Sequence, residues 1–448
     1  MSPNPIATNN LWNLPMSDYA KLTANPHRLM AENSKVVPNP SKKVITLQMG
    51  DPTIFGNFKR PQEAVDAIKQ AAEQDKFSYY HTMGLKVARQ AVADYVNKDG
   101  LNVSSDDVIM TSGGSSNLEM CFMALANVGD NILVPRPCFN YKTWLDGAEI
   151  EVRSYNLNVR KDWQVDLEDM ESKIDEKTRA ILINNVGNPC GNVFSKEHIL
   201  DILTLAERYQ LPIISDDIYE HFVFPGVDYY SVAALSRSVP ILSCSGLTKR
   251  FIMPGVRTGW IVMHDRCNAL TEVRQGLIRI SGRNFGPNCT VQQALPAILS
   301  NVPQEFFDDT VTRVQHHAML AFDGLRSVPG LNPIMPKGAF YMMIGIDLKN
   351  FPGISSCLDF VERLTEEQSV LAFPGPCFDF PGYFRFVLTI PEEMIIEACL
   401  RIEEFCQDHY HESKNDISRS YHRKANGAEN KILEGAPIIP KSFSSRVI

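Results

Sequence analysis

Residues 245–260 read SGLTKRFIMPGVRTGW and lie between two apolar runs, Val239–Leu242 and Trp260–Met263. Short apolar runs of this kind are typical of buried strands. Lys249 therefore follows closely after a buried strand, where a lysine is rare unless it is paired or takes part in chemistry. Taken alone, the segment is better explained as a surface loop that carries three basic residues. Its meaning depends on the rest of the chain.

Outward from this segment, short apolar runs alternate with helical patterns. Strands are expected at Val108–Thr111, Asn131–Val134, Ala180–Asn184 and Pro212–Ser215, and helices at Ser115–Ala126, from about Phe139, at Lys196–Tyr209, at Leu270–Ile280 and at Gln304–Ser327. Strands separated by helices of this length indicate βαβ units and a largely parallel sheet with both faces covered.

The pattern changes beyond Pro329. Alternating segments at Ala339–Ile344 and Tyr383–Thr389 flank expected helices at Ser356–Gln368 and Glu392–His409. This arrangement predicts a second, smaller α/β layer. The residues past His411 are polar, mixed in charge and without periodicity, which predicts a disordered tail.

Composition narrows the class of protein. The chain has 448 residues, enough for two domains, and its net charge of −8 argues against a nucleic-acid-binding face. No apolar run approaches the ~18 residues of a membrane span, and the first twenty residues resemble no targeting signal. Ten scattered cysteines without CxxC spacing indicate free thiols and a cytoplasmic location. The pairs His316-His317 and His409/His411 are expected at the surface of helices rather than at a metal site.

Two polar turns follow predicted strands. Thr111–Ser116, TSGGSS, joins a strand to a helix, and its glycines would let the backbone approach a phosphate at the helix N-terminus. A tight turn with a serine N-cap explains it equally well. Asn188-Pro189-Cys190-Gly191 follows the strand Ala180–Asn184, at the edge where open parallel sheets bind ligands. A plain turn is the simpler interpretation of that segment.

Two charged residues lie in apolar strand patterns. Asp216 closes the strand Pro212–Ser215, and a buried acid is unfavourable unless it meets a cation or a metal. A metal is one option, although no matching His or Cys cluster is found. A protonated pyridine nitrogen would also satisfy Asp216, and Tyr219 could hydrogen-bond the same ring. An Asp-Asp helix N-cap is the alternative. Arg385 suits a bidentate carboxylate, unless it faces outward from a half-exposed strand.

Together these clusters supply an amine nucleophile, phosphate-binding turns, a partner for a ring nitrogen and a clamp for a carboxylate. That set matches pyridoxal phosphate chemistry. Lys249 would form a Schiff base with the cofactor aldehyde. Asp216 would keep the pyridine nitrogen protonated, so that the ring can act as an electron sink.

The segment Gly246–Gly259 resembles the lysine-attachment signature of class I pyridoxal-phosphate aminotransferases, and the chain is most similar to the tyrosine aminotransferase subfamily. Other motifs that look like this subfamily, in the same order, are Asn25-Pro26-His27-Arg28, Pro38-Asn39-Pro40, Gly50–Asn57, Val134-Pro135-Arg136-Pro137, Asn188-Pro189-Cys190-Gly191, Val193–Lys196 and Ile241–Cys244. The likeness runs from about Asn25 to His411.

The resemblance implies an α/β protein of fold type I. It has a large domain with a mostly parallel seven-stranded sheet, sandwiched by helices, and a smaller α/β domain. The implied division is an N-terminal arm (1–24), the N-terminal part of the small domain (25–58), the large cofactor-binding domain (59–328), the C-terminal small domain (329–411) and a disordered tail (412–448).

The resemblance also implies roles for residues at matching positions. Lys249 binds the cofactor and shuttles a proton, Asp216 pairs with the pyridine nitrogen, and Tyr219 contacts the ring hydroxyl. The residues implied in cofactor binding are Gly113, Gly114, Ser115, Phe139, Asn188, Asp216, Tyr219, Gly246, Lys249, Arg257 and Tyr80, and those implied in substrate binding are Gly50, Asn188 and Arg385. No metal ligand is implied.

The resemblance implies that Tyr80 of a neighbouring subunit contacts the cofactor phosphate. The chain is therefore expected to form a homodimer with shared active sites. The loop Tyr79–Gly84 looks one residue shorter than in the family, which leaves the choice between Tyr79 and Tyr80 open. The segment Pro137–Tyr141 also looks one residue short. Both loops border the substrate pocket, so they put the choice of substrate in doubt.

The implied reaction is transamination of an aromatic L-amino acid, tyrosine or phenylalanine, with 2-oxoglutarate, giving the 2-oxo acid and glutamate. A broader aminotransferase, or a lyase that acts on cysteine-type substrates, would use the same lysine and arginine. A catalytically inactive binding protein on the same scaffold is the alternative from another class. The expected partners are small amino acids, 2-oxo acids and a second copy of the chain, with no nucleic acid and no membrane.

Overall fold

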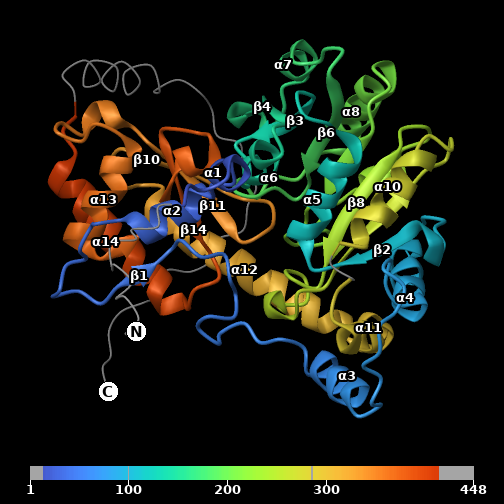
Figure 1. The fold of residues 1–448 in the computed structure, drawn as a ribbon. Coiled ribbons are helices and arrows are strands. Elements are labelled where there is room, and N and C mark those ends of the chain that lie inside the picture. Colours follow the sequence, from blue (N-terminus) through green and yellow to red (C-terminus); the bar gives the residue numbers. More distant parts are fainter. Residues whose placement is uncertain (1–13, 99, 284–285, 413–448) are drawn as a thin grey trace, which may run out of the picture.

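The computed structural model describes residues 14–98, 100–283 and 286–412. The predicted disordered tail lies outside these residues except for Glu412, and so do the first 13 residues of the predicted arm. The described chain contains two main sheets, each covered by helices (Figure 1), and a separate pair of short strands. Within the described part of the chain, no helix is both long and apolar enough to span a membrane.

The large sheet has eight strands in the described chain, in the order β2-β9-β8-β7-β6-β3-β4-β5. They are β2 (Val108–Thr111), β3 (Asn131–Arg136), β4 (Glu151–Asn158), β5 (Gln164–Val165), β6 (Thr178–Asn184), β7 (Ile213–Asp216), β8 (Ile241–Gly246) and β9 (Gly259–His264). The five strands from β8 to β4 pair in parallel, whereas β9 and β5 are antiparallel to their neighbours. The mostly parallel sheet is confirmed. The sheet has one strand more than the seven that the resemblance implied, since the two-residue β5 is added at its edge.

Helices cover both faces of this sheet because its strands are apolar on both sides. Ile213 of β7 packs in one core cluster with helix α8 (Lys196–Arg208). The next residue, Ile214, points the other way and packs with helices α5 (Gly114–Leu125) and α10 (Thr271–Ser281). Each such isoleucine is fully buried and contributes about 1.5–3 kcal/mol to folding. The central strands are therefore a rigid base for whatever lies at their ends.

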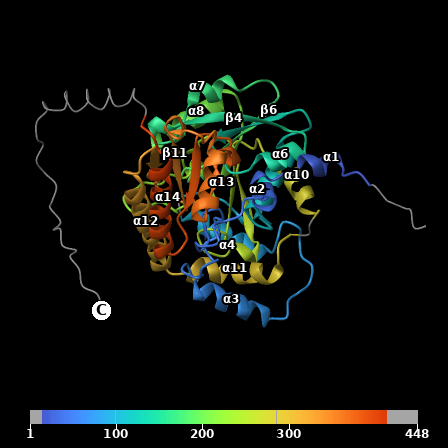
Figure 2. The same ribbon diagram turned by 90° about the vertical axis from the view of Figure 1, so that its left-hand side faces the viewer.

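The small sheet is antiparallel and contains β10 (Leu331–Ile334), β11 (Tyr341–Ile346), β14 (Tyr383–Val387) and β13 (Phe373–Pro374). A separate parallel pair, β1 (Ile45–Thr46) with β12 (Val370–Leu371), joins the N-terminal part of the chain to its C-terminal part. Helices α12 (Gln304–Leu325), α13 (Cys357–Gln368) and α14 (Glu392–His409) pack around this sheet (Figure 2). The predicted smaller α/β layer is thus present.

Helix α12 runs between the two sheets (Figure 1), and Phe306 near its start packs against core clusters of both. The remaining helices are α1 (Asp18–Leu22), α2 (Pro26–Asn33), α3 (Gln62–Ala72), α4 (Lys86–Asn97), α6 (Lys142–Gly147), α7 (Leu167–Ser172), α9 (Val232–Leu235) and α11 (Cys289–Asn301). All ten cysteines are free, as expected.

His317 corrects one expectation. It was expected at the surface, but it is 4% exposed, and its Nδ1 donates to the Leu388 carbonyl at 2.7 Å. Its neighbour His316 is half-exposed beside Glu392. Successive residues of a helix point about 100° apart, so one of two adjacent histidines can face the core.

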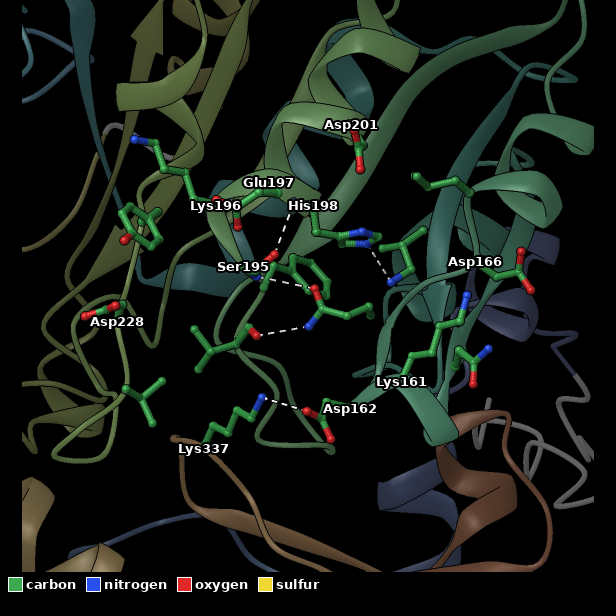
Figure 3. Close-up of a pocket in the computed structure, with 18 of the residues that line it drawn as sticks. Lys161, Asp162, Asp166, Ser195, Lys196, Glu197, His198, Asp201, Asp228 and Lys337 are labelled. Carbon is green, nitrogen blue, oxygen red and sulfur yellow. Dashed lines mark hydrogen bonds and ion pairs between the residues drawn. The ribbon is translucent and has the colours of Figure 1, made fainter.

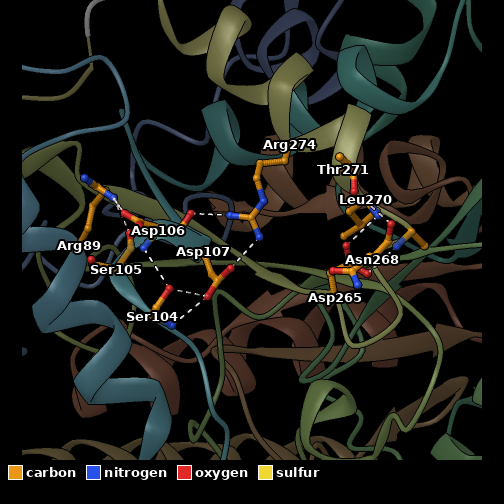
Figure 4. Close-up of polar contacts among 11 residues, drawn as sticks. Arg89, Ser104, Ser105, Asp106, Asp107, Asp265, Asn268, Leu270, Thr271 and Arg274 are labelled. Carbon is orange, nitrogen blue, oxygen red and sulfur yellow. Dashed lines mark hydrogen bonds and ion pairs between the residues drawn. The ribbon is translucent and has the colours of Figure 1, made fainter.

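A polar cluster fixes the start of β2 (Figure 4). Asp107 accepts hydrogen bonds from the N–H and hydroxyl of Ser104, both at 2.8 Å, and pairs with Arg274 of α10 at 2.6 Å. Arg89 of α4 donates to the Ser105 carbonyl at 2.5 Å. Helices α4 and α10 are thereby tied to the strand that leads to Gly113.

Candidate active site

Two of the predicted site residues, Asp216 and Gly246, lie with Asn184 at the carboxyl ends of adjacent parallel strands. Asn184 of β6 is in register with Asp216 of β7, and Gly246 ends β8 next to them. The Asn184 side chain donates to the Asp216 carbonyl at 2.9 Å, and its oxygen accepts from the N–H of Asn188 at 2.8 Å. Open parallel sheets bind ligands at this edge.

Asp216 is 5% exposed. Burial raises the pKa of its carboxyl to about 6, although hydrogen bonds from the Tyr141 hydroxyl and the Ile218 N–H act against the shift. The Tyr141 hydroxyl donates to Oδ2 at 2.8 Å. A carboxylate held this way can pair with a cationic N–H group of a ligand. No sequence pattern pointed to the role of Tyr141, because 75 residues separate it from Asp216.

Lys249 lies in the loop after β8 and points across to the N-terminal part of the chain. Its Nζ donates to the Gly50 carbonyl at 2.7 Å and lies 5.8 Å from the centre of the Tyr219 ring and 5.7 Å from that of Phe340. The fold therefore brings Lys249, Gly50 and Tyr219 together. The accidental surface loop is excluded, since the lysine is enclosed by aromatic rings and a backbone carbonyl.

Tyr341 of β11 is a second residue of the site that the sequence did not single out. Its hydroxyl lies 2.8 Å from the Tyr219 hydroxyl. Burial would raise the pKa of the Tyr341 hydroxyl, but the charges of Lys249 and Arg385 lower it below its usual value. A Cβ on Gly50 would lie 2.0 Å from this hydroxyl, so only glycine fits there.

Arg385 of β14 is 4% exposed, which rules out the outward-facing alternative. Its Nη1 donates to Asn188 Oδ1 at 3.0 Å, and its Nη2 donates to the Gln48 carbonyl at 2.6 Å. Its guanidinium lies 4.2 Å from the centre of the Tyr341 ring, and its Nε is buried without a hydrogen-bond partner among the residues that the structure describes. None of these contacts is a carboxylate, and burial lowers the pKa of the group. A ligand carboxylate would supply the missing partner.

The turn before α5 and the loop after the lysine form a cradle of glycines. Gly113 is the N-cap of α5 at φ 94°, and a Cβ there would lie 2.9 Å from Arg257 Nη2. A Cβ on Gly259 would meet the Gly113 backbone at 2.9 Å, and one on Gly246 would meet the Thr258 carbonyl at 2.7 Å. The N–H groups of Gly114 and Ser115 are at the open end of α5, beside the Arg257 guanidinium. This cradle fits a phosphate group.

Phe139 and Tyr80 are the remaining predicted residues. Phe139 lies beside Tyr141, with ring centres 6.1 Å apart, at the edge of the Asp216 site. Tyr80 is turned toward its own chain: its hydroxyl donates to the Pro287 carbonyl and accepts from Gln292 Nε2 at 2.6 Å. Its neighbour Tyr79 is 92% exposed.

The family model of aminotransferases class I and II matches residues 42–402. The chain belongs to this aminotransferase family. It is 46% identical to the tyrosine aminotransferase of Mus musculus and 45% identical to that of Homo sapiens, with 89% of each chain covered in both pairs. Among solved structures it is similar to the tyrosine aminotransferase of Leishmania infantum, with a TM-score of 0.86 at 32% identity over 89% of this chain and 99% of that chain.

The fold of this aminotransferase is therefore fold type I, as expected.

A cavity of about 1130 Å³ lies elsewhere, around Lys161, Ser195, His198 and Lys337 (Figure 3). None of the predicted site residues lines it. Two of its polar groups already have partners: Lys337 pairs with Asp162 at 3.0 Å, and His198 accepts from the Val165 N–H at 2.9 Å. The candidate active site is the closed cluster at the strand ends.

Proposed function

We propose that this aminotransferase moves the amino group of L-tyrosine to 2-oxoglutarate with pyridoxal phosphate as cofactor. The observation that carries the proposal is that Lys249, Asp216 and Arg385 all lie around the paired tyrosines Tyr219 and Tyr341. An amine, a carboxylate and a guanidinium without a carboxylate partner are the three groups that this chemistry needs. The similarity to tyrosine aminotransferases along the whole folded chain supports tyrosine as the donor.

The residues fit the cofactor. The cradle of Gly113, Gly114, Ser115 and Arg257 would hold its phosphate, and Asp216 would pair with its ring nitrogen. Tyr219 would contact the ring hydroxyl, Asn188 would help to hold it, and Phe139 would lie against the ring. When bound, pyridoxal phosphate supplies an aldehyde that takes the amino group and a cationic ring that withdraws electrons.

The chain's own groups bind and orient the substrate. Arg385 would take the α-carboxylate in bidentate fashion, with Asn188 and the Gly50 backbone beside it. Lys249 Nζ would remove the proton from the substrate Cα and deliver it to the cofactor carbon C4′. The hydrogen bond from Nζ to the Gly50 carbonyl holds the Lys249 amine between the loop after β8 and the N-terminal segment that contains Gly50.

A homodimer is part of the proposal. Several large apolar side chains are exposed along the N-terminal part of the chain, among them Leu14 at 78%, Val37 at 73% and Phe77 at 61%. A second copy would cover such a surface. Tyr79, rather than the inward-turned Tyr80, is then the tyrosine that reaches the neighbouring site. A cytoplasmic location stays a prediction.

The test is a coupled assay with L-tyrosine, 2-oxoglutarate and added pyridoxal phosphate. We expect 4-hydroxyphenylpyruvate and glutamate in equal amounts. Lys249→Ala should lower kcat at least about 100-fold, because the proton-transferring amine is lost. Lys337→Ala, which removes only a pair with Asp162, is the matched control and should keep full activity. Release of ammonia and pyruvate from cystine, without keto-acid formation from tyrosine, would instead identify a lyase.

A further inference from the structure

His27 lies in the aromatic wall beside the candidate site and has no role in the reaction described above. It belongs to α2, where the Asn25 side chain caps the helix by accepting from the Arg28 N–H at 3.1 Å. Met30, three residues on and on the same face, contacts Cys377 at 3.5 Å. The helix therefore holds the imidazole against the small domain rather than in solvent.

Three phenylalanine rings surround the imidazole. Phe139 is stacked on it at 6.0 Å between ring centres with an interplanar angle of 24°, while Phe373 and Phe378 meet it edge-on at 5.0 and 4.8 Å. The Arg385 guanidinium lies over the same two rings, 5.7 Å from Phe373 and 4.7 Å from Phe378. His27 and the proposed carboxylate clamp thus share two walls of one aromatic enclosure.

Both ring nitrogens of His27 are buried and have no hydrogen-bond partner among the described residues. Burial and the charge of Arg385 lower the pKa of the imidazole to about 3, so the ring is neutral near pH 7. A neutral imidazole has one N–H donor and one nitrogen acceptor. Two unsatisfied polar atoms in an apolar wall oppose folding unless something else compensates for them.

A phenol is the ligand group whose chemistry matches this wall. Its ring packs against phenylalanine, and its hydroxyl both donates and accepts a hydrogen bond. A phenyl side chain would fill the same enclosure but leave the nitrogens unpaired. A neutral imidazole offers no charge to hold a second carboxylate.

We propose that His27 is a specificity-determining residue that hydrogen-bonds the phenolic hydroxyl of the substrate and so selects tyrosine over phenylalanine. This inference rests on the proposed function and deepens it. Arg385 then binds the α-carboxylate of the amino acid, and His27 binds the phenolic hydroxyl at its other end.

The test uses two carboxylates that lack an amino group and cannot react, 3-(4-hydroxyphenyl)propanoate and 3-phenylpropanoate. Their affinities for the holoenzyme are measured by calorimetry. We expect the hydroxylated compound to bind roughly 10-fold more tightly, as one neutral hydrogen bond in a desolvated site allows. In His27→Phe, which keeps an aromatic ring but no nitrogen, the two affinities should become equal, and the ratio of kcat/KM for tyrosine over phenylalanine should fall by a similar factor.

Two further variants control for folding. His27→Gln keeps a donor and an acceptor and should retain part of the preference, so loss of packing and loss of hydrogen bonding are separated. His316→Phe, on the half-exposed face of α12, should leave both affinities unchanged. Equal binding of the two compounds to the wild type, or an undiminished preference in His27→Phe, overturns the role of His27 while tyrosine transamination persists. Absence of transamination with either amino acid instead overturns the proposed function.

Discussion

The buried carboxyl of Asp216 suits the proposed cofactor, but it lowers the stability of the cofactor-free protein near neutral pH. In the described structure its donors, the Tyr141 hydroxyl and the Ile218 N–H, are both neutral, and its pKa is raised from 3.8 to about 6 by burial. The folded chain therefore holds a proton between pH 3.8 and 6 that the unfolded chain has released. Stability from this group falls as pH rises through that window, and above it the cofactor-free protein carries an uncompensated charge.

Asp216→Asn should raise the melting temperature of the cofactor-free protein at pH 7.5, since it removes that charge. Two pKa units correspond to roughly 3 kcal/mol, which is the upper size of the effect. Near pH 4 the variant and the wild type should melt at similar temperatures, because the acid is then largely protonated. Activity should fall at least about 100-fold, since an amide cannot hold a cationic ring nitrogen. A variant that melts lower than the wild type at pH 7.5 would contradict this account; calorimetry at both pH values decides it.

At the scale of elements, the cluster before β2 shows how helices are fastened to the strand that carries the glycine turn (Figure 4). Burial alone would raise the pKa of Asp107, but hydrogen bonds from Ser104 and Arg274 and the charge of Arg274 lower it below its usual value. The group thus stabilises the fold above its ordinary pKa, and this stability is lost as pH falls through the lower pKa of the folded state.

Asp107→Asn should lower the melting temperature at pH 7, with a loss of about 1 kcal/mol, because a cap and a partly exposed ion pair are weakened. The loss should shrink at the lowest pH that the protein tolerates, where the wild-type carboxyl is also protonated. Asp66→Asn in α3 is the matched control, since that side chain is 59% exposed, pairs with exposed neighbours of its own helix and should change stability little. Thermal melts of the three proteins across pH give the comparison, and a pH-independent loss in Asp107→Asn would argue for packing instead of charge.

Elements with strong periodicity were predictable from the sequence, and weakly patterned ones were not. The helix Glu392–His409 and the strand Val108–Thr111 have the predicted bounds. β4 was missed, because its residues are mostly half-exposed and polar, and so carry no clear alternation. In the site, Lys249 and Asp216 stood out as charged residues after apolar strands. Tyr141, Tyr341 and His27 did not, because only the fold brings such distant residues together.

At the scale of the whole molecule, substitutions of the two adjacent tyrosines should have different effects. The change at Tyr79 should affect cofactor binding in the dimer, and the change at Tyr80 should affect the stability of the single chain. Tyr79→Phe should weaken pyridoxal phosphate binding roughly 10-fold or more, through loss of a hydrogen bond to a charged group. Tyr80→Phe should lower the melting temperature of the cofactor-free protein, since the bonds to Pro287 and Gln292 are lost. Absorbance titration with the cofactor and thermal melts measure both effects.

A mixing experiment checks the sharing of sites. When Lys249→Ala and Tyr79→Phe subunits are combined, one site of each hybrid dimer contains an intact lysine and an intact tyrosine. With the cofactor kept at a limiting concentration, the mixture should be more active than either parent, and failure to recover activity would exclude Tyr79 as the shared residue. The predicted boundaries between arm, small domain and large domain stay predictions.

The hydrogen bond from Arg385 to the Gln48 carbonyl has a consequence for the making of the protein. The two residues are 337 positions apart, so at about 5–20 residues per second roughly 20–70 s of translation separate them. The residues of the phosphate cradle and Lys249 are synthesised within this interval, before Arg385 is available to bind the Gln48 carbonyl. A chain cut short before β14 would keep the groups proposed to hold the cofactor and lack the one proposed to hold a substrate.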